Sequence, residues 1–192
     1  MNASDLEPDC ERCFALCCVA CSFSASRDFA LDKPAGEPCV YLTRAYRCAI
    51  HDELRARGFG GCASYRCSGA GQKVSQVTFA GRSWRDHPEI AEEMFDAFLT
   101  MRVLHEDIAL LRAALQLQLP PSLRARIDDK RVELERLTFS AVEQLSDYPV
   151  YERGREARAL LREIADALPR ARGGLVRIER RRGARRLAVE VG

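Results

Sequence analysis

Cysteine is the residue type in this chain whose number and spacing could do chemistry. All nine cysteines lie between residues 10 and 67 of the 192-residue sequence. They fall in four groups, Cys10-x2-Cys13-x3-Cys17-Cys18-x2-Cys21, then Cys39, then Cys48, and then Cys62-x4-Cys67. Thiolates at such short spacings are what a zinc ion or an iron–sulfur cluster requires. The spacing therefore predicts a metal site in the first third of the chain.

Disulfide bonds or merely buried thiols are the alternatives to a metal site. The N-terminus is acidic, and the apolar run of residues 14–20 is too short for a secretory signal or a membrane span. We therefore expect a cytoplasmic protein without a membrane segment, in which thiols stay reduced. An odd number of cysteines and the adjacent pair Cys17–Cys18 also fit a disulfide framework poorly. These points favour metal over either alternative.

The first cysteine group has the spacing of one helix face. Asp9 precedes it and is a candidate N-cap. If residues 10–21 are helical, at about 100° per residue, four thiols fall within about 80° of arc. Those four are Cys10, Cys13, Cys17 and Cys21. The N-terminus of such a helix would favour the thiolate form, although a stripe of cysteines could equally belong to a hydrophobic core.

Four blocks of the sequence resemble the YkgJ-type family, which is described as a zinc- or iron-chelating domain. After the first cysteine cluster come Pro38-Cys39-Val40-Tyr41-Leu42, Arg47-Cys48-Ala49-Ile50-His51, and Gly61-Cys62-Ala63-Ser64-Tyr65-Arg66-Cys67. The resemblance implies eight metal ligands, Cys10, Cys13, Cys17, Cys18, Cys39, Cys48, Cys62 and Cys67. Cys21 has no place in the pattern and is the spare. The chain departs from the family at residues 54–58, where an Arg-Pro pair is usual.

A narrower resemblance covers residues 10 to about 115. The segments at 32–36, at 68–79 and around Trp84 are similar to the N-terminal module of bacterial pentapeptide-repeat proteins. In those proteins the module precedes a right-handed β-helix. The tandem repeats that would build the β-helix are absent here, so the resemblance implies only the module.

Eight thiolates leave the identity of the cofactor open. They suit two four-coordinate zinc ions, one cubane cluster plus one zinc, or a cluster with a reserve ligand. Adjacent Cys17 and Cys18 point in different directions and could serve two different centres. His51, three residues after Cys48, is either a further ligand or a surface histidine, and we favour the surface.

Composition shifts divide the chain into four parts. We predict a Cys-rich metal-binding module over 1–72, a polar connector over 73–86, a helical domain over 87–169 and a basic β-hairpin tail over 170–192. The expected fold class is mainly α, with a small irregular Cys-rich module, an α-helical hairpin or three-helix unit and a short C-terminal β-hairpin. The Gly69-Ala70-Gly71 segment lacks the GxxxxGK[ST] pattern of a phosphate loop and is interpreted as a turn.

Apolar residues at helical spacing predict three helices in the second half. The first starts at His87-Pro88 and runs to Pro120, the second spans about 122–147, and the third spans about 151–168. The stripe of the first helix consists of Ile90, Met94, Phe98, Met101, Leu104, Ile108, Leu111 and Leu115. We expect this stripe to support a protein partner or a homodimer.

The tail carries eight arginines against two glutamates over residues 170–192. Alternating apolar residues on either side of Arg181-Arg182-Gly183-Ala184 predict the hairpin. Arginines could contact the phosphates of a nucleic acid, but the tail has no aromatic residue for stacking, and we favour a solvated hairpin tip. The net charge of +2 excludes a strong overall field.

No Ser-His-Asp, HExxH or acidic-pair pattern is found, so no catalytic residue is predicted. The sequence indicates a metal-binding cysteine-cluster protein that acts as an interaction or regulatory module. The alternative is an iron–sulfur redox protein or a component of a protein-modifying enzyme. Whether the chain is an enzyme is left open.

Overall fold

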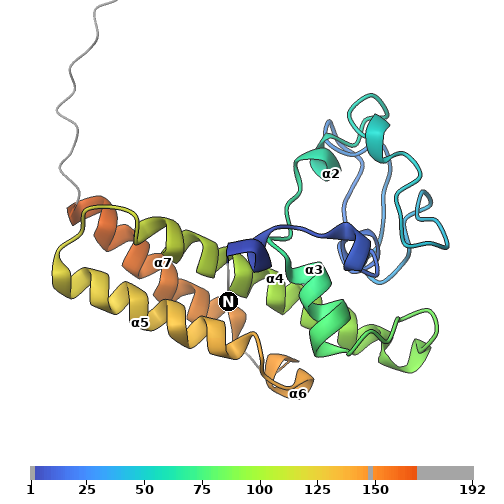
Figure 1. Ribbon diagram of the computed structural model, residues 1–192. Coiled ribbons are helices and arrows are strands. Elements are labelled where there is room, and N and C mark those ends of the chain that lie inside the picture. The colour runs from blue at the N-terminus through green and yellow to red at the C-terminus, as the bar shows by residue number, and fades with distance from the viewer. Residues whose placement is uncertain (1–2, 147–148, 168–192) are drawn as a thin grey trace, which may run out of the picture.

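The computed structural model of the chain describes residues 3–146 and 149–167. This part of the protein is mainly helical, as the sequence predicts, with three long helices beside an irregular Cys-rich region (Figure 1). The long helices are α4 (Ala91–Ala114), α5 (Pro121–Leu137) and α7 (Val150–Ala167). The β-hairpin predicted over 170–192 lies outside the described residues.

Helix α4 is the centre of the structure because every other long helix packs on it. It contacts α5, α6 and α7 on the bundle side and α1 and α3 on the side of the Cys-rich region. A 3₁₀ turn at Pro88–Ile90 precedes it, close to the predicted start. The apolar stripe that we expected to bind a partner is buried inside the chain from Ile90 to Leu111. A partner would therefore have to bind elsewhere on the molecule.

The second predicted helix is interrupted, which corrects the continuous helix expected over 122–147. Helix α5 ends at Leu137, and a separate short helix, α6 (Val142–Ser146), follows. The break falls at Thr138-Phe139-Ser140, residue types of modest helix propensity. There the Thr138 hydroxyl donates a hydrogen bond to the carbonyl of Glu135 at 2.8 Å. The third helix, α7, agrees with the prediction.

The Cys-rich region contains only short helical segments and turns. They are the 3₁₀ turns Ala3–Leu6, Cys10–Arg12 and His51–Glu53, the helices α1 (Leu16–Val19), α2 (Gly60–Ser64) and α3 (Ala70–Lys73), and the π-helix Val74–Thr78. Three isolated β-bridges, such as the one joining Leu42 and Cys48, link the loops between them. A small apolar cluster around Ile50, Leu54 and Phe59 fills the centre of these loops.

Residues 10–21 do not form the helix that would have aligned four thiols. Asp9 does cap the first turn, because its Oδ1 accepts hydrogen bonds from the backbone N–H groups of Glu11 at 3.0 Å and Arg12 at 3.3 Å. The chain is then extended at Cys13 (φ −109°, ψ 140°) and left-handed at Ala15 (φ 55°). A helix therefore restarts only at Leu16.

The predicted connector over 73–86 contributes to the core that the Cys-rich region shares with α4. Val74, Ser75, Phe79 and Trp84 in this segment are buried. The indole N–H of Trp84 donates to the carbonyl of Phe14 at 2.8 Å. This segment is therefore packed rather than polar and extended, while a domain boundary near residue 86 stays a prediction.

Two titratable side chains are buried two residues apart on α4. His105 is fully buried, and burial lowers its pKa to about 4, while its hydrogen bond to the Ser68 carbonyl at 2.6 Å acts in the opposite direction. Asp107 is 5% exposed, and burial raises its pKa to about 6 against the attraction of Arg158. Burial therefore shifts both groups toward the neutral form, relative to the same groups in the unfolded chain.

Replacing Asp107 by asparagine should stabilise the protein at neutral pH. An aspartate with a raised pKa favours the folded state below its unfolded pKa of 3.8, and that contribution is lost as the pH rises through about 6. Asp107→Asn should therefore raise the free energy of unfolding at pH 7.5 by roughly 1 to 3 kcal/mol, since one pKa unit corresponds to about 1.4 kcal/mol.

Thermal unfolding at several pH values checks this prediction. In wild-type protein the raised pKa of Asp107 opposes the effect of the lowered pKa of His105 on stability. The variant lacks this opposing group, so its stability should fall as the pH drops from 6.5 to about 4, because the unfolded state then binds a proton at His105 more readily than the folded state. An Asp107→Asn protein that melts at or below the wild-type temperature at pH 7.5 would contradict the account of this residue.

Candidate metal centre

We sort the eight cysteines predicted as ligands into two groups by the charges that shift their pKa values. The first consists of Cys10, Cys13, Cys17 and Cys67, and the second of Cys18, Cys39, Cys48 and Cys62, although Cys18 also acts on Cys10 of the first group. The charge of Cys67 raises the pKa values of Cys10 and Cys13, after the larger effect of burial. Burial and the charges of Cys18, Cys39, Cys48 and Cys21 together raise the pKa of Cys62 to about 11. The folded chain thus brings together thiols that are far apart in sequence.

The loop that carries Cys10 and Cys13 is held by one polar edge of α3 and the π-helix. Gln72 donates to the carbonyl of Glu7 at 2.6 Å and accepts from the N–H of Asp9 at 3.1 Å. Gln76 donates to the carbonyl of Arg12 at 2.8 Å, and the Ser75 hydroxyl accepts from the N–H of Phe14 at 3.0 Å. Positions 72, 75 and 76 share one helical face, so a single surface fixes the backbone on both sides of the two cysteines.

Gly71 leaves the space that the sulfurs of the first group occupy. A Cβ atom at this position would lie 2.6 Å from the Sγ of Cys13 and 3.9 Å from the Sγ of Cys67. The two sulfurs therefore flank one point of α3 from opposite ends of the Cys-rich sequence. Arg47 adds a hydrogen bond of 2.8 Å from its guanidinium to the carbonyl of Cys10.

Backbone N–H groups near two of the cysteines favour their thiolate form. Burial raises the pKa of Cys13 to about 11, and the N–H groups of Leu16 and Ala15 act in the opposite direction. Burial also raises the pKa of Cys48, and the N–H of Ile50 opposes it. Turns that place N–H groups near sulfur suit a thiolate better than a neutral thiol.

Backbone contacts assemble the second group. The N–H of Cys39 donates to the carbonyl of Cys18 at 2.9 Å, and Cys48 is joined to the residues after Cys39 by its bridge with Leu42. Cys62 lies in α2 and packs against the apolar cluster around Phe59. The group therefore draws on α1, the loop over 39–48 and α2.

Cys17 and Cys18 lie where the two groups meet. Their Sγ atoms are 3.9 Å apart. This contact raises the pKa of Cys17 and lowers that of Cys18, because one thiol donates to the other. The charge of Cys13 also raises the pKa of Cys17, whereas the charge of Cys18 raises the pKa values of Cys48, Cys62 and Cys10.

The side chains as they stand do not surround a metal ion. Within the described part of the chain, no three histidine, cysteine, aspartate or glutamate side chains are close enough together to hold one. Some thiols would have to turn about their side-chain bonds to do so. The donor set itself consists of seven partly buried cysteines and the exposed Cys10, and its two groups of four match the coordination number of zinc and of a cubane cluster.

The two residues that the sequence left open lie at the margin. The Sγ of Cys21 is 3.8 Å from the Tyr65 hydroxyl, and its charge raises the pKa values of Cys17 and Cys62. The His51 side chain is 73% exposed and contacts Asp52 at 3.4 Å, as a surface histidine would. Sequence reasoning missed the roles of Lys33, Gly71 and Gln72. The glycines of the Gly69-Ala70-Gly71 segment predicted a turn at Gly71. They did not show that Gly71 lies next to the sulfurs of Cys13 and Cys67.

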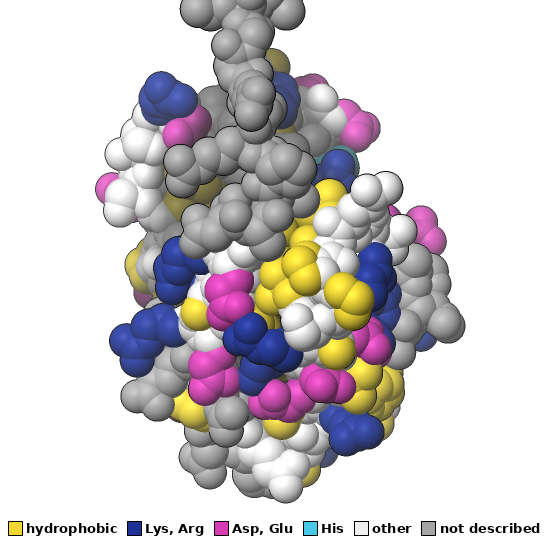
Figure 2. All heavy atoms as spheres, turned by 90° about the vertical axis from the view of Figure 1, so that its left-hand side faces the viewer, with side chains coloured by type: hydrophobic (Ala, Val, Ile, Leu, Met, Phe, Trp, Pro, Cys, Tyr) yellow, Lys and Arg dark blue, Asp and Glu magenta, His cyan; other side chains and the backbone are white. Residues whose placement is uncertain are grey.

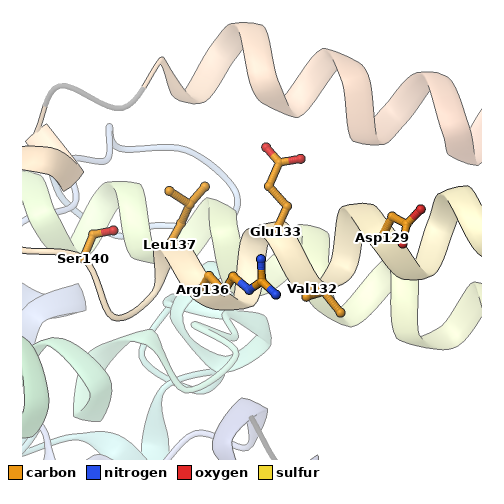
Figure 3. Close-up of a pocket in the computed structure, with 6 residues that line it drawn as sticks. All are labelled: Asp129, Val132, Glu133, Arg136, Leu137 and Ser140. Carbon is orange, nitrogen blue, oxygen red and sulfur yellow. The ribbon is translucent and has the colours of Figure 1, made fainter.

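Two hollows on the surface are lined by residues other than cysteine. A groove of about 490 Å³ runs along α5 and is lined by Asp129, Val132, Glu133, Arg136, Leu137 and Ser140 (Figure 3). A second hollow of about 310 Å³ lies between the N-terminal segment and α4. Neither is lined by a cysteine or a histidine, so we assign the chemistry to the cysteine groups.

Charges of both signs are interspersed on the bundle face seen in Figure 2. Arg126 pairs with Glu163 at 2.6 Å, and Lys130 pairs with Glu133 at 2.7 Å and with Glu156 at 2.8 Å. This face therefore has no single-sign field of the kind that nucleic acids require. Within residues 3–146 and 149–167, none of the helices combines the length and apolarity needed to span a bilayer.

Comparison with known proteins gives one informative relative. The chain is 43% identical over 162 residues to the uncharacterized protein YybG of Bacillus subtilis strain 168. The alignment covers 84% of this chain and 58% of the relative, so the chain spans well under two thirds of YybG. No family model matches the chain, and no solved structure matches it.

Gly71→Ala should displace Cys13 without unfolding the protein. Alanine favours a helix over glycine by about 1 kcal/mol, but its Cβ would meet the Cys13 sulfur at 2.6 Å. Cys13 should therefore react about tenfold faster with an alkylating reagent in metal-free reducing buffer, as followed by peptide mass spectrometry.

The matched control is Gly60→Ala in α2. The atom nearest its added Cβ is Oδ1 of Asp28 at 3.8 Å, an ordinary contact. This variant should leave every alkylation rate unchanged. Equal Cys13 rates in Gly71→Ala and wild-type protein would show that Gly71 does not make room for the sulfur.

Proposed function

We propose that the Cys-rich region is a metal-binding module with two four-thiolate centres, and that the protein acts as an interaction or regulatory module. The first centre would use Cys10, Cys13, Cys17 and Cys67. The second would use Cys18, Cys39, Cys48 and Cys62. Cys21 would remain outside both.

The observation that carries the proposal is that the fold brings thiols from distant parts of the chain together, beside backbone N–H groups that favour the thiolate. The N–H groups of Leu16 and Ala15 act on Cys13, and that of Ile50 acts on Cys48. Hydrogen bonds to a sulfur stabilise its ionised form, which is the form that binds metal. Without a metal, burial works against ionisation at both residues, so these N–H groups would support a charge that only a bound cation makes favourable.

The division into two centres is supported by the opposite neighbourhoods of Cys17 and Cys18. Cys17 interacts with Cys13 of the first group, and Cys18 mainly with Cys48 and Cys62 of the second, with a further effect on Cys10. Adjacent residues on a helical turn are about 100° apart in direction. One side chain can therefore face each centre, which would place the two centres next to each other.

Zinc and iron–sulfur clusters remain the two candidate cofactors. Either cofactor would cross-link the loops of this region, which has only short helical segments. A closed four-sulfur zinc site would be structural. An iron–sulfur centre would add electron transfer, and the alternative function of a redox protein or a component of a protein-modifying enzyme would follow.

Metal analysis of full-length protein purified without oxygen tests the proposal. We expect either about two zinc ions per chain in a colourless protein, or iron and sulfide with absorption near ~400 nm that dithionite bleaches. The first result favours the structural and interaction role, and the second favours the redox role. Protein that retains neither metal after reconstitution under reducing conditions would contradict the proposal.

Single serine variants test the division into centres. Cys67→Ser should lower the metal content to that of one centre, and Cys62→Ser should do the same for the other centre. Cys21→Ser is the control and should keep the full metal content. If Cys21→Ser loses as much metal as Cys67→Ser, or if each ligand variant loses all metal at once, the division is wrong.

A further inference from the structure

A buried lysine lies beside the second thiol group. Lys33 is 4% exposed, although lysine is almost never fully buried without a partner of opposite charge. Its ammonium donates three hydrogen bonds, to the carbonyls of Val19 at 2.9 Å, Cys21 at 2.6 Å and Pro34 at 2.8 Å. Its hydrogen bonding is therefore complete, while its charge is not yet compensated.

No carboxylate neutralises this charge at close range. Among residues 3–146 and 149–167, no aspartate or glutamate forms an ion pair with Lys33, and its other close contact is the Phe23 ring at 5.9 Å. Burial of a charge without a counter-ion costs several kcal/mol. The fold would retain such a charge only if something else compensates it.

Thiols, which become anionic as thiolates, are the main groups whose charge would offset that of Lys33. Burial lowers the pKa of Lys33, and the charges of Cys21, Cys39 and Cys18 oppose that effect more than the charge of Glu37 does. The backbone brings these residues together. Val19, whose carbonyl binds the ammonium, also accepts the N–H of Gly36 at 2.9 Å, and the carbonyl of Cys18 accepts the N–H of Cys39 at 2.9 Å. The ammonium is thus fixed between α1 and the loop that leads to Cys39.

We propose that Lys33 is the built-in counter-cation of the second centre, an inference that rests on the proposed metal function. A divalent ion held by four thiolates keeps two net negative charges, and so does an oxidised cubane cluster with four cysteine ligands. A fixed ammonium beside such a dianion is attracted far more strongly in a buried site than in water. The charge that is unfavourable without a metal becomes favourable once the centre forms.

The competing explanation is that Lys33 only ties three carbonyls together. The two explanations differ in what a neutral side chain does. Lys33→Gln keeps amide donors for the carbonyls but removes the charge, and Lys33→Met removes both. Lys33→Arg keeps the charge. A counter-cation requires the charge, whereas a hydrogen-bond clamp requires only the donors.

Chelator competition on the zinc-loaded full-length chain separates them. We expect Lys33→Gln and Lys33→Met to lower the affinity for one of the two zinc ions by roughly 10- to 100-fold. This is the usual cost of removing a group that supports metal ligands. Lys33→Arg should hold that zinc more tightly than either, and the second zinc should be unaffected in all three. Lys73→Met is the matched control, because Lys73 is also partly buried but responds to Asp5 rather than to thiols.

Each outcome decides the matter. Wild-type affinity in Lys33→Gln would overturn the inference in favour of a clamp, and equal losses in Lys33→Arg and Lys33→Gln would do the same. If Lys33→Met fails to fold by circular dichroism, Lys33→Gln carries the test alone. Wild-type protein that binds no zinc and no cluster would instead refute the proposed function itself, which keeps the two failures distinct.

Discussion

The Cys-rich region depends on hydrogen bonds from side chains to backbone carbonyls and N–H groups. Its helical segments are short and its bridges isolated, so regular secondary structure fixes little of its backbone. Gln72 and Gln76 hold the first cysteine loop against α3, and Lys33 gathers three carbonyls around α1. These few side chains replace the ladder of a sheet, and they determine where the thiols lie.

The same contacts make the region part of one structure with the helices. Trp84 reaches back to Phe14, and His105 on α4 donates to the carbonyl of Ser68 directly after Cys67. Leu16 and Val19 of α1 are buried in the cluster that contains Met94 and Phe98. The loops that carry the thiols are therefore joined to α4 through packed side chains, and the regulatory role proposed above would rest on this contact.

The long helices could be predicted from the sequence, and the details of the cysteine region could not. Apolar spacing identified α4 and α7 because their buried faces repeat over many turns. The break after Leu137 was missed because Thr138-Phe139-Ser140 carries no proline or glycine. The helix expected over 10–21 failed because the left-handed Ala15 and the extended Cys13 are set by contacts with Ser75 and Trp84, more than sixty positions away. The cysteine spacing predicted a metal site, which stays a prediction, and it pointed to no role for Lys33.

X-ray absorption at the metal edge of the loaded full-length protein tests the central claim most directly. The account predicts a first shell of four sulfur atoms per metal at about 2.3 Å, without a major contribution from nitrogen or oxygen. A shell dominated by nitrogen or oxygen, or one with two sulfurs or fewer per metal, would contradict the assignment of two four-thiolate centres.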